Sequence, residues 1–350
     1  MPLFSVVIPL FNKQPFIRRC IESILRQTVQ DFEINVVDDG STDGSSDVVR
    51  SIQDPRVNLI VQANRGVGAA RNTGIAAARG RLIAFLDADD EWRPFFLEAM
   101  RTLHQSYPQA GLLATGYRRC LSLDYRFDRE LTLVSPPARP QFLLNNFLRV
   151  AIFSNFVTSS STAVARSVID TLGGFDEDAA FGEDLEFWLR IALRYPTAFD
   201  ARILAICHSE AANRACNRRP KKAQYPPAIR TLRAALEQRI VSDEMVRDAF
   251  TYIDLWRMQY VYWHLQFRDV EGARYLLKEQ FLRVRFRIEA FLLRIGIRSL
   301  PVRLILALKY KPTNLWSWLR QPIIGQRILG SGERRLGRQV LVRIVPQHPV

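Results

Sequence analysis

Short hydrophobic runs alternate with segments of helical periodicity over the first 117 residues of the chain. The first run, 4–8, is almost continuously hydrophobic, which is typical of a strand buried on both faces of a parallel sheet. Similar patterns predict strands at 33–37, 57–61, 81–86 and 111–115, and helices around 17–25, 45–52, 66–79 and 94–104. The alternation predicts an α/β fold with a doubly wound, mostly parallel sheet flanked by helices.

Polar side chains follow each of the first four predicted strands, where open α/β sheets bind their ligands. The densest group is Asp87, Asp89 and Asp90. Three carboxylates so close together repel one another unless a cation lies among them, and an all-oxygen ligand set favours Mg²⁺ or Mn²⁺. The alternative for the group is a solvated acidic turn that caps the following helix. For Asp90 itself we expect capping of that helix rather than a catalytic role.

Five motifs, in this order and spacing, resemble glycosyltransferase family 2, whose members are inverting, nucleotide-sugar-dependent enzymes with a GT-A fold. They are SVVIPLFN at 5–12, VVDDGSTD at 36–43, NRG at 64–66 with ARNTG at 70–74, FLDADD at 85–90, and GFD at 174–176 with FGED at 181–184. The resemblance covers roughly residues 3–200. It implies a GT-A fold, a nucleotide-sugar donor, a divalent cation (Mn²⁺ or Mg²⁺), and an acceptor hydroxyl on a glycan or glycolipid.

The resemblance also assigns a nucleotide-binding set. Asp39 would accept a hydrogen bond from the imide N–H of uracil or thymine, which favours a UDP-sugar and then a dTDP-sugar; otherwise Asp39 shapes an Asp-Gly turn. Phe11 would stack on the base or belongs to the core, and Arg71 would brace the base or phosphates. The whole set is Pro9, Phe11, Asn12, Asp39, Arg71 and Asp87.

The acidic motifs would supply the metal ligands and the catalytic base. Asp89 would bind the metal that bridges the diphosphate, with Asp87 near the ribose or the metal. Asp184 would take the proton of the acceptor hydroxyl, with Glu183 as the second choice for the base; the alternative for Asp184 is capping of a predicted helix at 185–194. Two tryptophans, Trp92 and Trp188, either form sugar-stacking walls or lie in the core.

Charge divides the chain unevenly. Residues 1–200 carry a net charge of −3 and residues 201–350 a net charge of +17. We therefore expect a catalytic domain at 1–208, a linker at 209–227 and a basic helical region at 228–350, with a packed helical pair over 228–280. Within the last region, 281–300 is a basic amphipathic segment that either lies in an anionic membrane interface or packs on the catalytic domain.

The remaining composition narrows the class of protein. Four scattered cysteines without a CxxC pair suggest neither a disulfide framework nor a zinc site. The N-terminus has no pattern of a signal peptide, and the sequence has no long uncharged hydrophobic window. We therefore expect a cytoplasmic protein, which is peripheral at the inner face of the cytoplasmic membrane if the basic segment binds lipid. The basic half alone would also suit a nucleic-acid-binding protein, but it contains no recognisable nucleic-acid motif; we therefore favour the transferase.

Overall fold

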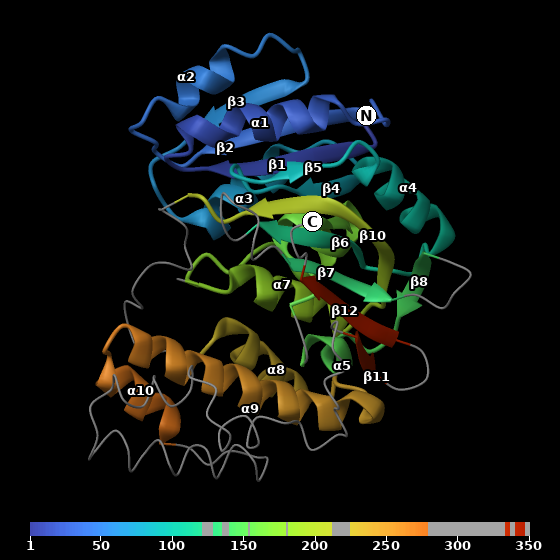
Figure 1. Ribbon diagram of the computed structural model, residues 1–350, viewed down its shortest axis with the longest axis vertical. Coiled ribbons are helices and arrows are strands. Elements are labelled where there is room, and N and C mark those ends of the chain that lie inside the picture. Colours follow the sequence, from blue (N-terminus) through green and yellow to red (C-terminus); the bar gives the residue numbers. More distant parts are fainter. Residues whose placement is uncertain are drawn as a thin grey trace. The chain divides into compact units, whose positions relative to one another are not determined.

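The computed structural model describes residues 1–120, 129–134, 140–152, 155–179, 181–211, 225–278, 333–336 and 340–346 (Figure 1). The chain divides into two compact units. The first is an α/β unit made of residues 1–216 and 330–350, and the second is a helical unit made of 217–329.

Parallel strands form the first part of the α/β unit. The strand order here is β3-β2-β1-β4, and each neighbouring pair is parallel, as in a doubly wound sheet. The strands are β1 (Phe4–Leu10), β2 (Phe32–Asp38), β3 (Val57–Val61) and β4 (Leu82–Phe85), and the helices between them are α1 (Gln14–Leu25), α2 (Ser45–Arg50) and α3 (Val67–Ala77). These elements agree with the prediction from the sequence to within a few residues.

Alternate residues of the strands pack on opposite helical layers. Val6 and Ile8 belong to a buried cluster that also contains the hydrophobic residues of α1 and of α4 (Phe96–Ser106). On the other face, Val7 and Val37 meet α3 at Gly74, where an added Cβ would lie 2.5 Å from Val7. Glycine at this position therefore lets the helix approach the sheet closely.

Beyond β4 the sheet becomes mixed rather than mostly parallel. Here β9 (Thr162–Ala165) lies antiparallel between β4 and β6 (Leu112–Cys120), and β10 (Thr197–His208) runs parallel to β6. The short strands β5 (Glu91–Trp92) and β8 (Gln141–Leu144) pair with β10, and β7 (Arg129–Val134) pairs with β6. The remaining elements of this part are α5 (Phe147–Ala151), the 3₁₀ turn η1 (Ser159–Ser161), α6 (Arg166–Leu172) and α7 (Glu183–Ala192).

The end of the chain differs from the expectation that 228–350 is helical throughout. The structure contains β11 (Glu333–Leu336) and β12 (Val340–Pro346), and β12 pairs antiparallel with β7 in the α/β unit. The VLVRIVP sequence of β12 is rich in β-branched residues, which favour a strand. The predicted amphipathic segment at 281–300 lies outside the described residues.

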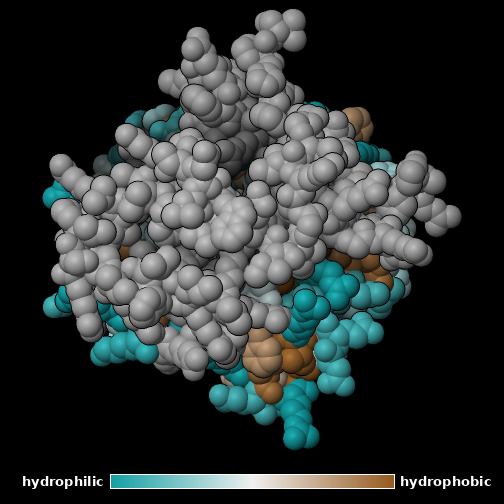
Figure 2. Space-filling view, turned by 60° about the horizontal axis from the view of Figure 1, so that its bottom comes forward, coloured by the Kyte–Doolittle hydropathy of each residue, from teal (hydrophilic) through white to brown (hydrophobic). Residues whose placement is uncertain are grey.

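The helical unit contains three described helices in place of the expected pair. They are α8 (Pro227–Glu237), α9 (Asp243–Gln266) and α10 (Val270–Leu277). The turn from α9 to α10 is tied by Asp269, whose carboxylate oxygens bind the ring of His264 at 2.8 Å and the backbone N–H of Gly272 at 2.9 Å. On the face turned forward in Figure 2, a small group of hydrophobic side chains is visible among hydrophilic ones.

Candidate active site

The acidic loop that follows β4 is fastened to its surroundings through its backbone. From α1, Arg19 donates to the carbonyl of Asp89 at 2.8 Å, and the thiol of Cys20 lies 3.6 Å from the carbonyl oxygen of Asp87. Within the loop, the N–H of Asp90 donates to the carbonyl of Asp87 at 2.9 Å. The loop is therefore a tight turn held against α1, with its backbone partly committed before any ligand binds.

Two of the three carboxylates of this loop are already paired with cationic side chains. Lys13 Nζ lies 2.8 Å from Asp89 Oδ2, and both side chains are 11% exposed. Arg71 Nη2 lies 2.8 Å from Asp87 Oδ1. Lys13 is a site residue that the sequence did not single out; its proximity to an aspartate 76 positions away follows only from the topology.

The donor set suits a hard divalent cation whose coordination is completed by phosphate. Mg²⁺ and similar ions are commonly bound through one or two carboxylates together with substrate phosphates and water. Asp89 and Asp87 could supply these carboxylates, and the Lys13 ammonium beside Asp89 shows that this carboxylate already attracts a cation. In the described part of the chain, no group of three or more His, Cys, Asp and Glu side chains is placed to hold a metal without such help.

The third carboxylate, Asp90, is buried and does not cap a helix. Its oxygens accept hydrogen bonds from the hydroxyl of Ser160 at 2.6 Å and from the backbone N–H of His208 at 2.9 Å. Helix α4 begins at Phe96, and its N-cap residue is Phe95. Burial and the nearby carboxylates of Asp89 and Asp87 raise the pKa of Asp90 to about 7. The predicted capping role is therefore wrong, and Asp90 joins the loop to β10 instead.

Four of the six residues predicted to bind the nucleotide lie at the carboxyl ends of β1 and β2: Pro9, Phe11, Asn12 and Asp39. The Asp39 carboxylate is 3% exposed and accepts three hydrogen bonds of 2.8 Å, from the side chain of Gln62 and the backbone N–H groups of Arg65 and Gly66. Asp39 therefore shapes the loop before α3. Asn12, with a positive φ of 52°, accepts from the backbone N–H of Thr42 and so joins the loops after β1 and β2. Pro9 and Phe11 are partly buried beside them.

Arg71 connects the two acidic motifs. Its side chain is 4% exposed, and its guanidinium lies 2.8 Å from Asp87 and 2.6 Å from Glu183. It also stands 5.2 Å from the ring centre of Phe175, a cation–π contact. The two carboxylates keep Arg71 charged in spite of its burial and raise its pKa above the usual value.

Asp184 occupies the first turn of α7 but does not cap it. The N-cap is Gly182, whose φ of 78° favours glycine. An oxygen of Asp184 accepts the N–H of Leu185 at 2.7 Å. Burial and the neighbouring Glu183 raise the pKa of Asp184 to about 7, although Arg71 opposes the shift. Glu183 is committed to Arg71, so Asp184 is the better placed of the two to exchange a proton near neutral pH.

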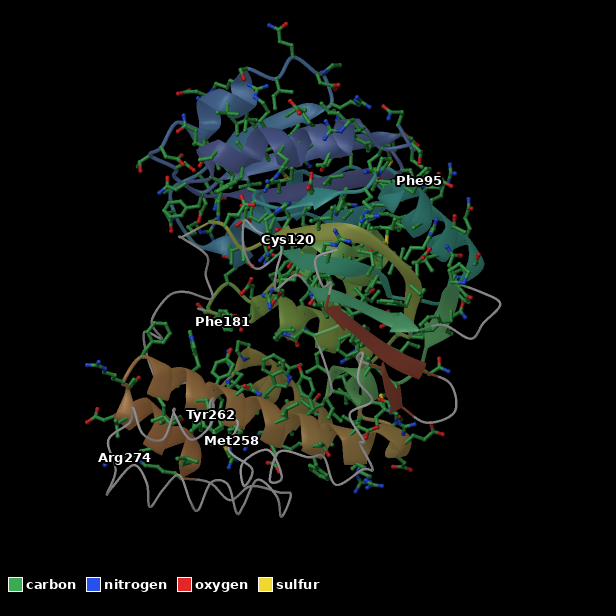
Figure 3. The ribbon with its side chains drawn as sticks, in the orientation of Figure 1. Phe95, Cys120, Phe181, Met258, Tyr262 and Arg274 are labelled. Carbon is green, nitrogen blue, oxygen red and sulfur yellow. The ribbon has the colours of Figure 1, made fainter. Side chains whose placement is uncertain are left out.

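The GFD motif fixes the segment that leads to α7, on which Phe181 is labelled in Figure 3. Asn72 of α3 accepts the N–H of Phe175 at 2.8 Å and donates to its carbonyl at 2.9 Å. A Cβ on Gly174 would stand 2.3 Å from the Asn72 oxygen, so the motif requires glycine there. Trp92 and Trp188 are 4% and 0% exposed, which places both in the core rather than in a sugar-binding wall.

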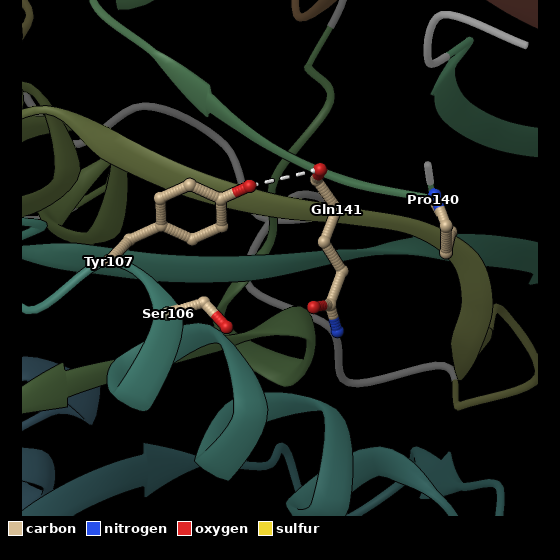
Figure 4. Close-up of a pocket in the computed structure, with 4 residues that line it drawn as sticks. All are labelled: Ser106, Tyr107, Pro140 and Gln141. Carbon is tan, nitrogen blue, oxygen red and sulfur yellow. Dashed lines mark hydrogen bonds between the residues drawn. The ribbon is translucent and has the colours of Figure 1, made fainter. Parts of the chain in front are cut away.

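A separate hollow of about 360 Å³ lies between the end of α4 and β8 (Figure 4). It is lined by Ser106, Tyr107, Pro140 and Gln141, and Tyr107 donates to the carbonyl of Gln141 at 3.1 Å. These residues adjoin the amino ends of β6 and β10, at the opposite edge of the sheet from the acidic loop. They include no charged group, so the hollow adds nothing to the candidate active site.

Two solved structures resemble this chain in fold. One is Staphylococcus aureus TarS (residues 1–349) in complex with UDP-GlcNAc, with a TM-score of 0.56 and 18% identity over 84% of this chain and 81% of that one. The other is the mannosyltransferase PcManGT from Pyrobaculum calidifontis in complex with GDP-Man and Mn²⁺, with a TM-score of 0.55 and 21% identity over 91% and 84%. The fold is therefore that of the GT-A glycosyltransferases, as predicted.

Sequence comparison finds relatives for the first part of the chain. Residues 5–169 match the model of Glycosyl transferase family 2. ExoO of Rhizobium meliloti, a succinoglycan biosynthesis protein, is 36% identical over 53% of this chain and 54% of its own length. A chondroitin synthase of Escherichia coli is 44% identical over 39% of this chain and 19% of its own length. The chain thus spans about half, or less, of the length of these curated relatives.

Proposed function

We propose that the chain is an inverting glycosyltransferase that moves a sugar from a nucleotide sugar to a hydroxyl of a glycan or glycolipid in polysaccharide biosynthesis. A UDP-sugar is the donor we favour because the family resemblance assigns Asp39 to the imide N–H of uracil; in the structure both oxygens of Asp39 also accept hydrogen bonds from the loop before α3 or from Gln62. The observation that supports this proposal most strongly is that one buried arginine, Arg71, forms ion pairs with both Asp87 of the Asp-x-Asp loop and Glu183 of the Glu183-Asp184 motif. The names of the relatives, succinoglycan biosynthesis protein and chondroitin synthase, support the substrate class.

The residues divide the reaction among themselves. Asp184 accepts the proton of the acceptor hydroxyl as its oxygen attacks the anomeric carbon. The bond from that carbon to the diphosphate oxygen breaks, its electron pair leaves with the nucleoside diphosphate, and the configuration inverts. Asp89, with Asp87, would hold Mn²⁺ or Mg²⁺, which when bound neutralises charge on the departing diphosphate.

Lys13 has a defined part in this scheme. Its ammonium lies 2.8 Å from Asp89, the proposed metal ligand. Because one carboxylate cannot bind two cations at full strength, a metal ion held by Asp89 would compete with Lys13, whose ammonium would then be free to pair with a phosphate of the donor. Arg71 stays between Asp87 and Glu183 and balances their charge beside the donor.

The membrane-interface prediction rests on residues 281–300, which lie outside the described ranges, and it stays a prediction. The localisation, which was inferred from the N-terminal and hydropathy pattern, stays a prediction as well. None of the helices among the described residues combines the length and hydrophobicity needed to cross a bilayer.

Calorimetric titration of the purified protein with UDP, dTDP, GDP and CMP, each with and without Mn²⁺, tests the donor proposal. We expect tight, Mn²⁺-dependent binding of UDP. Asp89→Ala should abolish the Mn²⁺-dependent part, whereas Asp47→Ala, which removes an exposed carboxylate from α2, should bind as the wild type does. Absence of binding by all four nucleotides would contradict the proposal.

A further inference from the structure

The 3₁₀ turn η1 lies beside the acidic loop and is not part of any motif that the sequence singled out. Its three serines are completely or almost completely buried, between 0% and 1% exposed. Two of them make the element itself rigid: Ser161 accepts the N–H of Thr158 at 3.0 Å, and the carbonyl of Ser159 accepts the hydroxyl of Thr162 at 2.9 Å. The middle residue, Ser160, directs all its side-chain hydrogen bonding to the acidic loop.

Ser160 makes three hydrogen bonds to the loop and its continuation. Its hydroxyl oxygen accepts the backbone N–H of Asp87 at 3.1 Å and the same hydroxyl donates to the carboxylate of Asp90 at 2.6 Å. Its carbonyl accepts the indole N–H of Trp92 at 2.6 Å. One buried residue thus holds the first and last aspartates of the Asp87–Asp90 turn, with Asp89 between them.

We propose that Ser160 is a positioning residue for the metal- and diphosphate-binding loop of this enzyme, an inference that rests on the proposed function. Removing its hydroxyl takes away the hydrogen bond that the Asp87 N–H makes to it and one hydrogen bond that the Asp90 carboxylate accepts. Arg19 and Cys20 bind carbonyl oxygens of the turn from α1, and Lys13, Arg71 and the His208 N–H bind its carboxylates; none of them replaces the bond to the Asp87 N–H. The backbone of the turn is then held less firmly, and with it the spacing of the Asp87 and Asp89 carboxylates.

The chain offers a matched control in the preceding residue. Ser159 is 1% exposed, belongs to the same turn, and its hydroxyl has no hydrogen-bond partner within the described part of the protein. Ser159→Ala and Ser160→Ala therefore delete the same buried atom from adjacent positions of one element. Only the second deletion removes hydrogen bonds to the acidic loop.

The test compares UDP and uridine binding by calorimetry in the wild type, Ser159→Ala and Ser160→Ala, with Mn²⁺ present. Loss of a partner that orients metal ligands typically lowers affinity by 10-fold to 100-fold. We expect Ser160→Ala to weaken Mn²⁺-dependent UDP binding by about 10-fold or more, to leave uridine binding unchanged, and to differ in this from Ser159→Ala. Equal losses in both variants, or a parallel loss of uridine binding, would show a general packing effect and overturn the proposal.

Hydrogen exchange gives a readout that does not depend on the donor. The amides of residues 86–92 should exchange faster in Ser160→Ala than in Ser159→Ala, and unchanged exchange would overturn the proposal even if the wild type bound no nucleotide. Failure of the wild type to bind UDP would count against the proposed function alone. If Ser160→Ala does not fold, Ser160→Cys, which keeps a weaker hydrogen-bonding group of similar size, replaces it in both measurements.

Discussion

Replacing Arg71 by methionine tests the buried ion pairs that connect the two acidic motifs. The guanidinium is 4% exposed, and Glu183, which is 9% exposed, relies on it for compensation. Asp87 is 36% exposed, so water screens that pair and it contributes less. Removing one partner of a buried pair costs about 3–5 kcal/mol because a charge is left uncompensated. Because the buried pair with Glu183 contributes most of this cost, we expect Arg71→Met to lower the free energy of unfolding by about 3 kcal/mol.

Urea denaturation followed by circular dichroism measures this change, provided that the slope with denaturant stays constant. The control is Arg50→Met on α2, which breaks an exposed pair with Asp47 and should cost less than about 0.5 kcal/mol. Adding Glu183→Gln to Arg71→Met removes the orphaned charge and should restore part of the stability. The reasoning is refuted if Arg71→Met costs less than about 1 kcal/mol, or if the double variant is the least stable of the set.

Three further outcomes are expected. Asp184→Asn should keep UDP and Mn²⁺ binding but lose transfer by about 10²-fold to 10⁴-fold, measured in single-turnover assays; near-normal turnover would move the base to Glu183. Since the pKa of Asp184 is raised to about 7, the turnover of the wild type should rise as the pH passes through 7. The contribution of Asp184 to the free energy of unfolding should be complete below pH 3.8, its ordinary pKa, and should be lost as the pH rises through 7. Gly174→Ala should destabilise the protein by about 1–3 kcal/mol through Asn72, and by clearly less in an Asn72→Ala background, as thermal unfolding can show.

The hydrophobic pattern of the sequence was enough to predict the first part of the fold. The strands and helices up to 106 follow from hydrophobic periodicity, because each strand of the parallel sheet is buried on both faces and each helix on one. The strands that make the sheet mixed were harder to predict, since β9 and β10 take their neighbours from distant parts of the chain. The sequence also gave no sign that β12 returns to β7 after the helical unit.

The residues of the candidate site likewise divide into those that the sequence pattern predicts and those that only the folded structure reveals. Its motif residues could be predicted because the carboxyl ends of parallel strands meet at one edge of the sheet. Lys13 and Ser160 could not, because a lone lysine and one serine among three carry no signal until the fold brings them to Asp89 and Asp90. Asp90 was assigned to a cap because the sequence shows the next helix but not the β10 backbone that binds it.

The pairing of β12 with β7 has a consequence for how the chain can be divided. The helical unit is an insertion, since residues 217–329 leave the α/β unit and 330–350 return to it. A protein truncated after α10 would lack β12 as well, and the backbone of β7 would become an unpaired sheet edge that favours aggregation. Isolating the α/β unit therefore calls for an internal excision in which a linker joins the segment after β10 to the start of β11.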